Sequence, residues 1–392
     1  MIDPRVGTSR RDFIVRGAQF AAVLGLGAPL LQACGGDDDD GQVSDAIGDG
    51  LKPEGGPLRL YNYPDYVNPD VVSGFESKYG VKVEITTFDV DSEAITKLAN
   101  GSVDVDVFHS AAPNTIDRLI LGGLLQPLNH SYLANFANVL PSFQDPWYDK
   151  GSKYSVPYTV FSSGIGYRAD RIDPADVEAQ GWDILWNPDY KGVTSILDDY
   201  REGIGMALLR KGITDVNTTD KALIEQAGKD LSELTDTMNI KVNIEAYKDV
   251  PEGSTNLAHT WSGDMLAGAA SNLPEGTDAS VLGWWYPSDG VGVVNNDAIT
   301  VVAKAKNPVL AHLYINYLLD VGVSEQNVAW NGYLPPIKGL DADYLIAQGY
   351  VPDNLRNAVL TDDIIKKGLR FEPLPVDADQ LWTDTWSKFT AG

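Results

Sequence analysis

The chain has 392 residues, a formal net charge of −25 and a single cysteine. This charge repels nucleic acid and anionic lipid head groups, which argues against a nucleic-acid-binding protein; it suits a cationic ligand, although solubility explains it equally well. One cysteine leaves no disulfide pair and no thiolate metal site. The length exceeds that at which a single hydrophobic core usually divides, so we expect two lobes.

The N-terminal residues combine two export signals. Arg10 and Arg11 precede an uncharged apolar run over residues 17–33, which is the pattern of a twin-arginine signal peptide. The run is too short, and too interrupted by Gly and Pro, for a membrane span. It ends at Cys34 in a sequence that resembles the lipobox of bacterial lipoproteins, which implies that this cysteine is acylated. The alternative is an anchor helix followed by a buried structural cysteine.

Residues 34–56 contain four adjacent aspartates and several glycines. Adjacent like charges repel one another and cannot be buried, so this stretch is predicted to be a flexible acidic tether. The aspartate run lacks the alternating ligand spacing of an EF-hand loop, which argues against a calcium site.

The rest of the chain alternates short apolar runs with amphipathic segments. The patterns predict strands over residues 57–63, 81–88, 103–108, 155–167, 193–197 and 296–302. They predict helices over residues 68–79, 92–100, 113–122, 201–211, 220–237, 257–271 and 309–319. Strands that alternate with helices in this way indicate an α/β fold with a largely parallel sheet.

Several phrases of this body occur in the order found in one family. They are Leu60-Tyr61-Asn62-Tyr63-Pro64-Asp65-Tyr66-Val67, Tyr154-Ser155-Val156-Pro157-Tyr158, Leu185-Trp186-Asn187-Pro188-Asp189-Tyr190-Lys191-Gly192, Asp198-Asp199-Tyr200-Arg201-Glu202, Trp261-Ser262-Gly263, Asn296-Asp297-Ala298-Ile299 and Gly332-Tyr333-Leu334-Pro335. Together they resemble the spermidine/putrescine-binding proteins of bacterial ABC importers over essentially all of the chain from Pro57 onward. The first, third and fourth phrases are the most specific.

The resemblance implies an α/β, two-lobe periplasmic-binding-protein fold (type II-like), with two mixed sheets joined by crossing hinge strands near Phe161 and Asn296. We expect four parts: a signal peptide (1–33), the tether (34–56), a first lobe (57–161 plus 297–338) and a second lobe (162–296 plus 339–392). Lobes arranged in this way close about a hinge when a ligand enters the cleft.

The acidic ligand residues implied by the resemblance are Asp199, Glu202 and Asp297. Carboxylates would pair with the ammonium groups of a polyamine, and such pairs strengthen when the closed cleft excludes water. For Asp199 and Glu202 the alternative role is to cap a helix N-terminus. Asp297 lies in an otherwise apolar run, where an acid requires a ligand or an ion-pair partner.

The aromatic ligand residues implied by the resemblance are Tyr63, Tyr66, Trp261 and Tyr333. Rings pack against methylene groups and attract cations through their faces, although each of the four could instead belong to the core. The chain also departs from the family: Asn295 replaces a tryptophan, and Ala112 and Asn114 stand where ligand residues are expected. The stretch 284–286, Trp-Trp-Tyr, either fills the gap or belongs to the core.

Motifs for catalysis are missing from the sequence. The histidines at 109, 130, 259 and 312 have no metal-binding spacing, and there is no Gly-x-Ser-x-Gly elbow and no phosphate-binding loop. We therefore expect no cofactor, no metal and no enzymatic activity, and instead a monomeric, lipid-anchored or periplasmic subunit that delivers a polyamine-like cation to an ABC permease and its ATPase. Same-fold receptors for ferric ion, thiamine-like cations or opines, or a ligand sensor, stay open as alternatives.

Overall fold

The computed structural model describes residues 45–88 and 91–391. The predicted export signal and acylation site, with Arg10, Arg11 and Cys34, lie outside the described residues. Within the described part, no helix combines the length and the apolar character needed to cross a bilayer.

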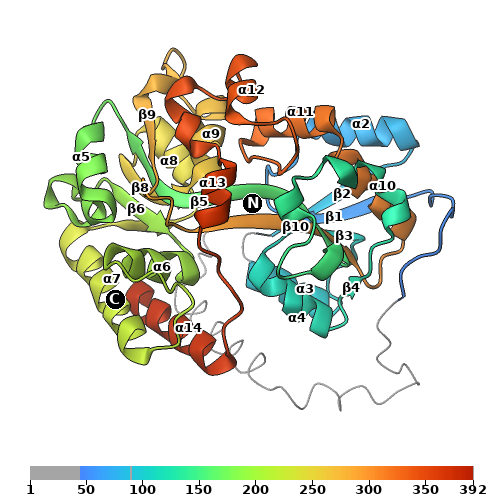
Figure 1. Ribbon diagram of the computed structural model, residues 1–392, viewed down its shortest axis with the longest axis horizontal. Coiled ribbons are helices and arrows are strands. Elements are labelled where there is room, and N and C mark those ends of the chain that lie inside the picture. Colours follow the sequence, from blue (N-terminus) through green and yellow to red (C-terminus); the bar gives the residue numbers. More distant parts are fainter. Residues whose placement is uncertain (1–44, 89–90, 392) are drawn as a thin grey trace, which may run out of the picture. The chain divides into compact units, whose positions relative to one another are not determined.

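A ten-stranded mixed sheet organises the protein (Figure 1), and its strand order is β2-β1-β3-β10-β5-β8-β6-β7, with β4 beside β10 and β9 beside β5. The strands are β1 (Leu58–Asn62), β2 (Val83–Thr87), β3 (Val107–Ala111), β4 (Leu125–Gln126), β5 (Ser155–Arg168), β6 (Thr194–Leu197), β7 (Lys241–Asn243), β8 (Leu257–Trp261), β9 (Leu282–Trp285) and β10 (Val294–Val302). Pairing is parallel among β1, β2 and β3 and among β6, β7 and β8. The expected parallel pairing therefore holds within each half of the sheet.

Two long antiparallel strands join the halves, and Figure 1 shows them crossing the middle of the molecule. Residues 155–162 of β5 pair with β10, and residues 163–168 pair with β8 and β9. Strand β10 in turn pairs with β3 and β4 on its other side. The exchange of partners at Ser162 and Ser163 places the middle of β5 and the start of β10 at the junction of the halves.

Helices surround both halves of the sheet. They are α2 (Pro69–Tyr79), α3 (Asp91–Ala99), α4 (Pro113–Leu121), α5 (Pro174–Gln180), α6 (Tyr200–Arg210), α7 (Lys221–Met238), α8 (Ala246–Glu252), α9 (Ser262–Ser271), α10 (Pro308–Leu318), α11 (Val321–Asn331), α12 (Ala342–Ala347), α13 (Asp362–Lys367) and α14 (Val376–Ala391). Short sequence signals explain where many of these helices begin and end. In α2, Asn68 accepts a hydrogen bond from the Asp70 N–H, proline occupies the first turn, and Gly80 ends the helix with a positive φ of 67°.

Two sequence expectations are wrong in part. The predicted helix 257–271 is a strand, β8, followed by a helix, α9, because Leu257 to Trp261 pair between β5 and β6 at the centre of the sheet. A short apolar run of this kind does not distinguish strand from helix by its periodicity. The third strand begins at Val107 rather than at residue 103.

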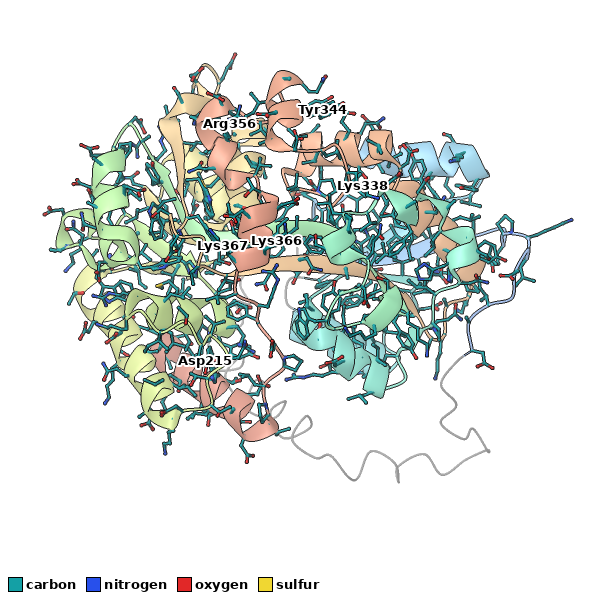
Figure 2. All side chains as sticks on the ribbon, in the orientation of Figure 1. Asp215, Lys338, Tyr344, Arg356, Lys366 and Lys367 are labelled. Carbon is teal, nitrogen blue, oxygen red and sulfur yellow. The ribbon has the colours of Figure 1, made fainter. Side chains whose placement is uncertain are left out.

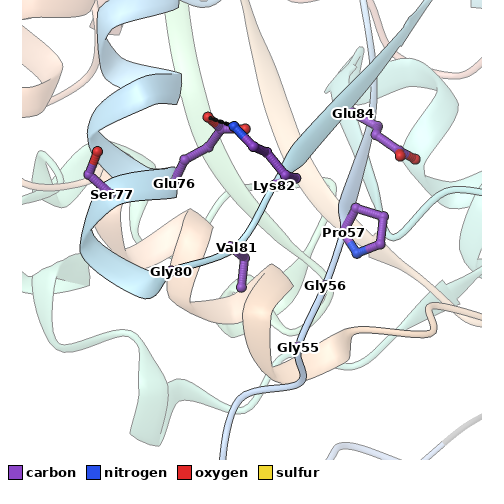
Figure 3. Close-up of a pocket in the computed structure, with 9 residues that line it drawn as sticks. All are labelled: Gly55, Gly56, Pro57, Glu76, Ser77, Gly80, Val81, Lys82 and Glu84. Atoms are coloured by element: carbon purple, nitrogen blue, oxygen red, sulfur yellow. Dashed lines mark hydrogen bonds and ion pairs between the residues drawn. The ribbon is translucent and has the colours of Figure 1, made fainter.

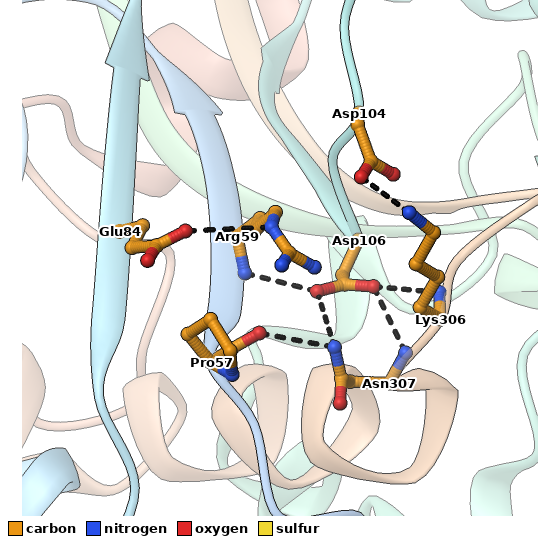
Figure 4. Close-up of polar contacts among 7 residues, drawn as sticks. All are labelled: Pro57, Arg59, Glu84, Asp104, Asp106, Lys306 and Asn307. Atoms are coloured by element: carbon orange, nitrogen blue, oxygen red, sulfur yellow. Dashed lines mark hydrogen bonds and ion pairs between the residues drawn. The ribbon is translucent and has the colours of Figure 1, made fainter.

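Asp106, just before β3, explains the later start of that strand (Figure 4). Its carboxylate accepts hydrogen bonds from the backbone N–H groups of Arg59, Lys306 and Asn307, at 2.7 to 2.9 Å, and from the Asn307 side chain at 3.0 Å. The buried carboxylate therefore joins β1 to the loop that follows β10, and it satisfies N–H groups that would otherwise lack partners.

Buried apolar side chains form one large cluster and two main smaller ones. The large cluster contains residues from both halves of the sheet, such as Val71, Val160 and Trp284. One smaller cluster packs α4 against β3, and the other packs α6, α7 and α14 in the opposite half. The junction of β5 and β10 thus lies among three packed cores.

Residues 45–56, the last part of the predicted tether, form no helix or strand. They nevertheless contact the folded body: the Glu54 carboxylate accepts hydrogen bonds from the N–H groups of Val309 and Leu310 at the start of α10, and Asp49 accepts from the side chains of Asn129 and Ser131. The boundary between tether and body at residue 56 stays a prediction.

Candidate ligand-binding site

The site is built on the two crossing strands. In their antiparallel register Thr159 lies opposite Asp297, and Phe161 lies opposite Asn295. Side chains two residues apart, or directly opposite one another, point to the same face of a sheet. Thr159, Phe161 and Ser163 of β5 therefore form one surface with Asn295 and Asp297 of β10, and the predicted ligand residues gather around it.

Asp297 anchors one end of this surface. Its Oδ2 accepts a hydrogen bond from the Tyr66 hydroxyl at 2.7 Å, and that hydroxyl lies 2.7 Å from Thr159 Oγ1. The Tyr66 backbone carbonyl is held in turn by the Tyr158 hydroxyl at 2.6 Å and by Asn331 at 2.9 Å. Burial raises the pKa of Tyr66 well above its usual value, so the phenol remains a hydrogen-bond donor at neutral pH.

Tyr333 extends this end towards α9. Its ring packs edge-on against Tyr66 at 5.4 Å and Phe161 at 5.7 Å between ring centroids. Its hydroxyl donates a hydrogen bond to Asp264 Oδ1 at 2.6 Å, while Thr260 donates to the other oxygen. Burial raises the pKa of Asp264 to about 6.

Glycines at two positions allow this approach of Tyr333. A Cβ atom at Gly263 would lie 2.5 Å from the Tyr333 ring, and one at Gly332 would lie 2.2 Å from the backbone nitrogen of Ala267. Gly332 also has a φ of 73°, in the region that favours glycine. Because Gly263 and Gly332 lack a Cβ atom, α9 and the end of α11 can approach one another closely.

Glu202 forms the other end of the surface. It lies in the first turn of α6 and is only 4% exposed. Its Oε1 accepts hydrogen bonds from Ser163 Oγ at 2.9 Å, Trp261 Nε1 at 3.0 Å and, more weakly, Asn295 Nδ2 at 3.4 Å. Burial, and to a lesser extent the charge of Asp199, raise the pKa of Glu202 to about 7, although the donors on Oε1 oppose this rise.

Asp199 has the capping role that the sequence offered as an alternative. Its Oδ1 accepts hydrogen bonds from the N–H groups of Arg201 at 2.8 Å and Glu202 at 3.0 Å, so it caps α6. Burial raises its pKa, and these two N–H groups oppose the rise. The cap also fixes the orientation of the first turn of α6, and hence the position of Glu202.

The remaining aromatic predictions divide between site and core. Tyr63 packs against Tyr66 at 6.0 Å and Phe88 at 4.5 Å, and Trp261 packs against Phe161 at 6.0 Å. Within the stretch 284–286, Trp284 is buried in the large core, and Trp285 packs on Trp182.

The two other departures from the family lie at the start of α4. Ala112 precedes the first residue of this helix and makes no side-chain cap, and the side chain of Asn114 is not described.

Two buried acids of the site, Glu202 and Asp264, are without a cationic partner in the described part of the chain. Among the described residues, neither Glu202 nor Asp264 forms an ion pair with a Lys or Arg side chain. The labelled cations in Figure 2, such as Lys338 and Lys366, lie at the surface. Enclosing a carboxylate without a cation is unfavourable, so these acids can accept a positive charge from outside the protein.

A separate hollow of about 630 Å³ lies between α2 and the start of β1 (Figure 3). No aromatic side chain lines it, and Glu76 there already accepts hydrogen bonds from Lys82 at 3.1 Å and from the Val83 N–H at 2.9 Å. None of the predicted ligand residues lines this hollow, so we do not assign the ligand to it.

Sequence reasoning missed several members of the site. Asp264 could have been predicted from the sequence, because it follows the predicted ligand residue Trp261 by three residues and therefore lies one helical turn away. Thr159, Phe161 and Ser163 alternate along a predicted strand, but their significance depends on the register with β10.

A chain of two α/β halves joined by crossing strands, with buried acids and aromatic rings at the junction, is built as a solute-binding protein. It belongs to the family described as "Bacterial extracellular solute-binding protein", which it matches over residues 70–350. It is 31% identical over 284 residues to the spermidine/putrescine-binding periplasmic protein of Escherichia coli (71% of this chain, 77% of the relative) and 30% identical over 342 residues to that of Salmonella typhimurium (86% and 92%).

A solved structure from Listeria monocytogenes, titled a putative spermidine/putrescine ABC transporter, superposes with a TM-score of 0.73 at 25% identity. The superposition covers 85% of this chain and 98% of the other. The two-lobe periplasmic-binding-protein fold expected from the sequence is therefore confirmed.

Proposed function

We propose that this protein binds a polyamine between its two halves and delivers it to the permease and ATPase of an ABC importer. The observation that carries the proposal is the pair of buried carboxylates, Glu202 and Asp264, for which the described part of the chain supplies no lysine or arginine. The names of the relatives support the same ligand class. A polyamine supplies the missing positive charges, and the hydrocarbon between them suits the rings of Tyr66, Trp261 and Tyr333.

The placement of acids at both ends of the site suits a ligand with at least two ammonium groups. Asn295, which contacts Glu202, and Asp297 are two residues apart on β10, so their Cα atoms are separated by about 7 Å. A carboxylate at each end and rings between them match a linear diamine or triamine. In the ligand-free protein, hydroxyl and N–H groups of neighbouring residues donate hydrogen bonds to these carboxylates. We expect the ammonium groups of the ligand to bind beside these donors or to displace them.

The proposed mechanism requires closure and no covalent chemistry. We assign residues 57–161 plus 297–338 to one lobe and residues 162–296 plus 339–392 to the other, with the crossing strands as the hinge. The ligand bridges the halves, so it stabilises the closed form that the permease recognises. We further propose that the protein acts as a monomer and is held at the outer face of the membrane by acylated Cys34.

Calorimetry on the folded chain from residue 35 tests the proposal. Spermidine, putrescine and cadaverine are titrated alongside a monoamine of matched length and ferric citrate. We expect at least one polyamine to bind with a Kd of about micromolar or below, and the monoamine to bind far more weakly because it fills one acidic end only. Absence of heat from every polyamine would contradict the polyamine assignment.

A further inference from the structure

The second oxygen of Glu202 is unlike the first. Oε1 accepts three hydrogen bonds, whereas Oε2 is buried and has no hydrogen-bond partner among the described residues. The imidazole of His259 on β8 lies close to it, with Nε2 3.8 Å from Oε2. His259 is 1% exposed, and within residues 45–88 and 91–391 neither of its ring nitrogens has a hydrogen-bond partner.

Two unsatisfied polar atoms thus face one another inside the protein. Leaving either one unsatisfied costs on the order of 1–3 kcal/mol. A proton on Glu202 Oε2, donated to the His259 Nε2 lone pair, satisfies both atoms after a shift of less than about 1 Å. An ionised Glu202 needs a donor at the same oxygen, which an entering ammonium group supplies.

The other groups around Glu202 leave this assignment intact. From its own helix, Asp199 adds a negative charge, which favours a protonated Glu202. The Arg201 guanidinium turns away and donates to the backbone carbonyls of Glu372 and Val216. The neighbours on the remaining elements, Ser163 of β5, Trp261 of β8 and Asn295 of β10, do not carry charge at neutral pH. The far side of His259 is covered by Trp182, at 5.7 Å between ring centroids.

We propose that Glu202 and His259 hold one proton between them in the ligand-free protein, and that a cation binding at Glu202 displaces this proton into solution. The inference rests on the proposed function for the identity of the cation. In the exchange, the O–H bond of the Glu202 carboxylic acid breaks, its proton passes to the buffer, and the carboxylate that remains accepts a hydrogen bond from the ligand's ammonium group. Burial raises the pKa of Glu202 to about 7 and lowers that of His259 to about 3, so the proton resides on the glutamate.

The proton can be observed without any ligand. In protein labelled with carbon-13 at the glutamate side-chain carboxyls, we expect one resonance to titrate with a midpoint near pH 7, and that resonance to be missing from Glu202→Gln. His259→Phe removes the acceptor and should lower the midpoint by about half a pH unit or more. His259→Gln restores an acceptor oxygen and should recover part of that shift. An absence of any glutamate titrating above about pH 6, or an unchanged midpoint in His259→Phe, would overturn the proposal.

The release is measured by calorimetry with spermidine near pH 6.5 in buffers of different ionisation enthalpy. We expect the apparent heat to depend on the buffer and to indicate a release approaching one proton per ligand, with affinity falling as the pH is lowered. Asp215→Asn, which removes an acid at the surface (Figure 2), serves as the control: it should keep the proton release, whereas Glu202→Gln should lose it. Heat that is independent of buffer would contradict the displacement. Absence of binding by any polyamine would instead contradict the proposed function, and the carboxyl titration would still decide whether the proton is held.

Discussion

The two ends of the site treat a carboxylate differently. At one end Asp297 is half-buried and accepts a hydrogen bond from the Tyr66 phenol, itself positioned by Tyr158 and Asn331. At the other end Glu202 is almost fully enclosed, with one oxygen bonded to three donors and the other facing an unpaired histidine. Both ends present an acid, and a buried histidine lies near each: His109 packs against Tyr66 at 6.3 Å between ring centroids, and His259 Nε2 lies 3.8 Å from Glu202 Oε2.

This difference assigns separate tasks to the ends. A partly exposed carboxylate held by a phenol is suited to first capture of an ammonium group. An enclosed carboxylate has a raised pKa, and a cation that compensates for its burial favours the ionised form, so it is suited to detect that the site is filled. Four measurements test this comparison.

The largest loss of affinity is expected from a change to Asp297, the partly exposed acid. Asp297→Asn removes a charge while keeping the shape, and we expect spermidine affinity to fall roughly a hundredfold, because a hydrogen bond to a charged group in a dry site contributes about 1.5–3 kcal/mol. Calorimetry near pH 8 measures it. Asp215→Asn, at the surface (Figure 2), removes the same charge outside the site and should leave affinity unchanged. Equal losses in both variants would mean that only net charge matters.

The enclosed end should dominate the pH dependence of stability. The folded-state pKa of Glu202, about 7, lies above its unfolded value of about 4.5, so the folded protein binds more protons between these values. As far as this group is concerned, the unfolding free energy of the ligand-free protein should therefore be greatest below about pH 4.5 and should fall by on the order of 3 kcal/mol as the pH rises to about 7. Urea denaturation at a series of pH values tests this, and Glu202→Gln should flatten the profile.

A smaller effect is expected from the donors around Glu202. Trp261→Phe keeps a ring against Phe161 and removes the Nε1–H that reaches Glu202 Oε1. Loss of this hydrogen bond favours the protonated acid, so affinity should fall roughly threefold to tenfold near pH 7 and recover towards pH 8.5. Trp147→Phe, at an exposed position, is the control. A loss that does not change with pH would indicate that the indole acts only by contact with the ligand.

The smallest effect is expected from an ion pair outside the site. Arg118 of α4 and Asp379 of α14 lie 2.9 Å apart, and Asp379 also accepts a hydrogen bond from the Tyr200 hydroxyl at 2.7 Å. The pair joins the two halves, but Arg118 is 47% exposed, and such pairs contribute at most about 1 kcal/mol. Arg118→Ala should weaken spermidine binding about twofold in low salt and less in high salt. A loss above about tenfold would show that this contact, rather than the buried acids, controls closure.

Much of the fold was accessible from local patterns. Helix signals such as Asn68-Pro69 and Gly80 predicted α2 to within one residue, and the order of phrases indicated the family. The predicted helix 257–271 failed because its first half is a central strand whose partners, β5 and β6, are distant in sequence. For Tyr66 and Tyr333 the sequence indicated the residues without predicting which contacts they make, whereas for Asp199 it offered the helix cap as one of two roles.

Residue identity and short-range spacing were enough to predict the types of side chain that can recognise a cation, the alternation of strands and helices, and the export signals expected at the N-terminus. Long-range packing places Phe161 opposite Asn295, joins Asp264 and Tyr333 by a hydrogen bond, and brings His259 close to Glu202. Those relations depend on strand register and on the burial that long-range packing creates. The same burial raises the pKa of Glu202, so the proposed proton exchange is a property of the folded site and has no signal in the sequence.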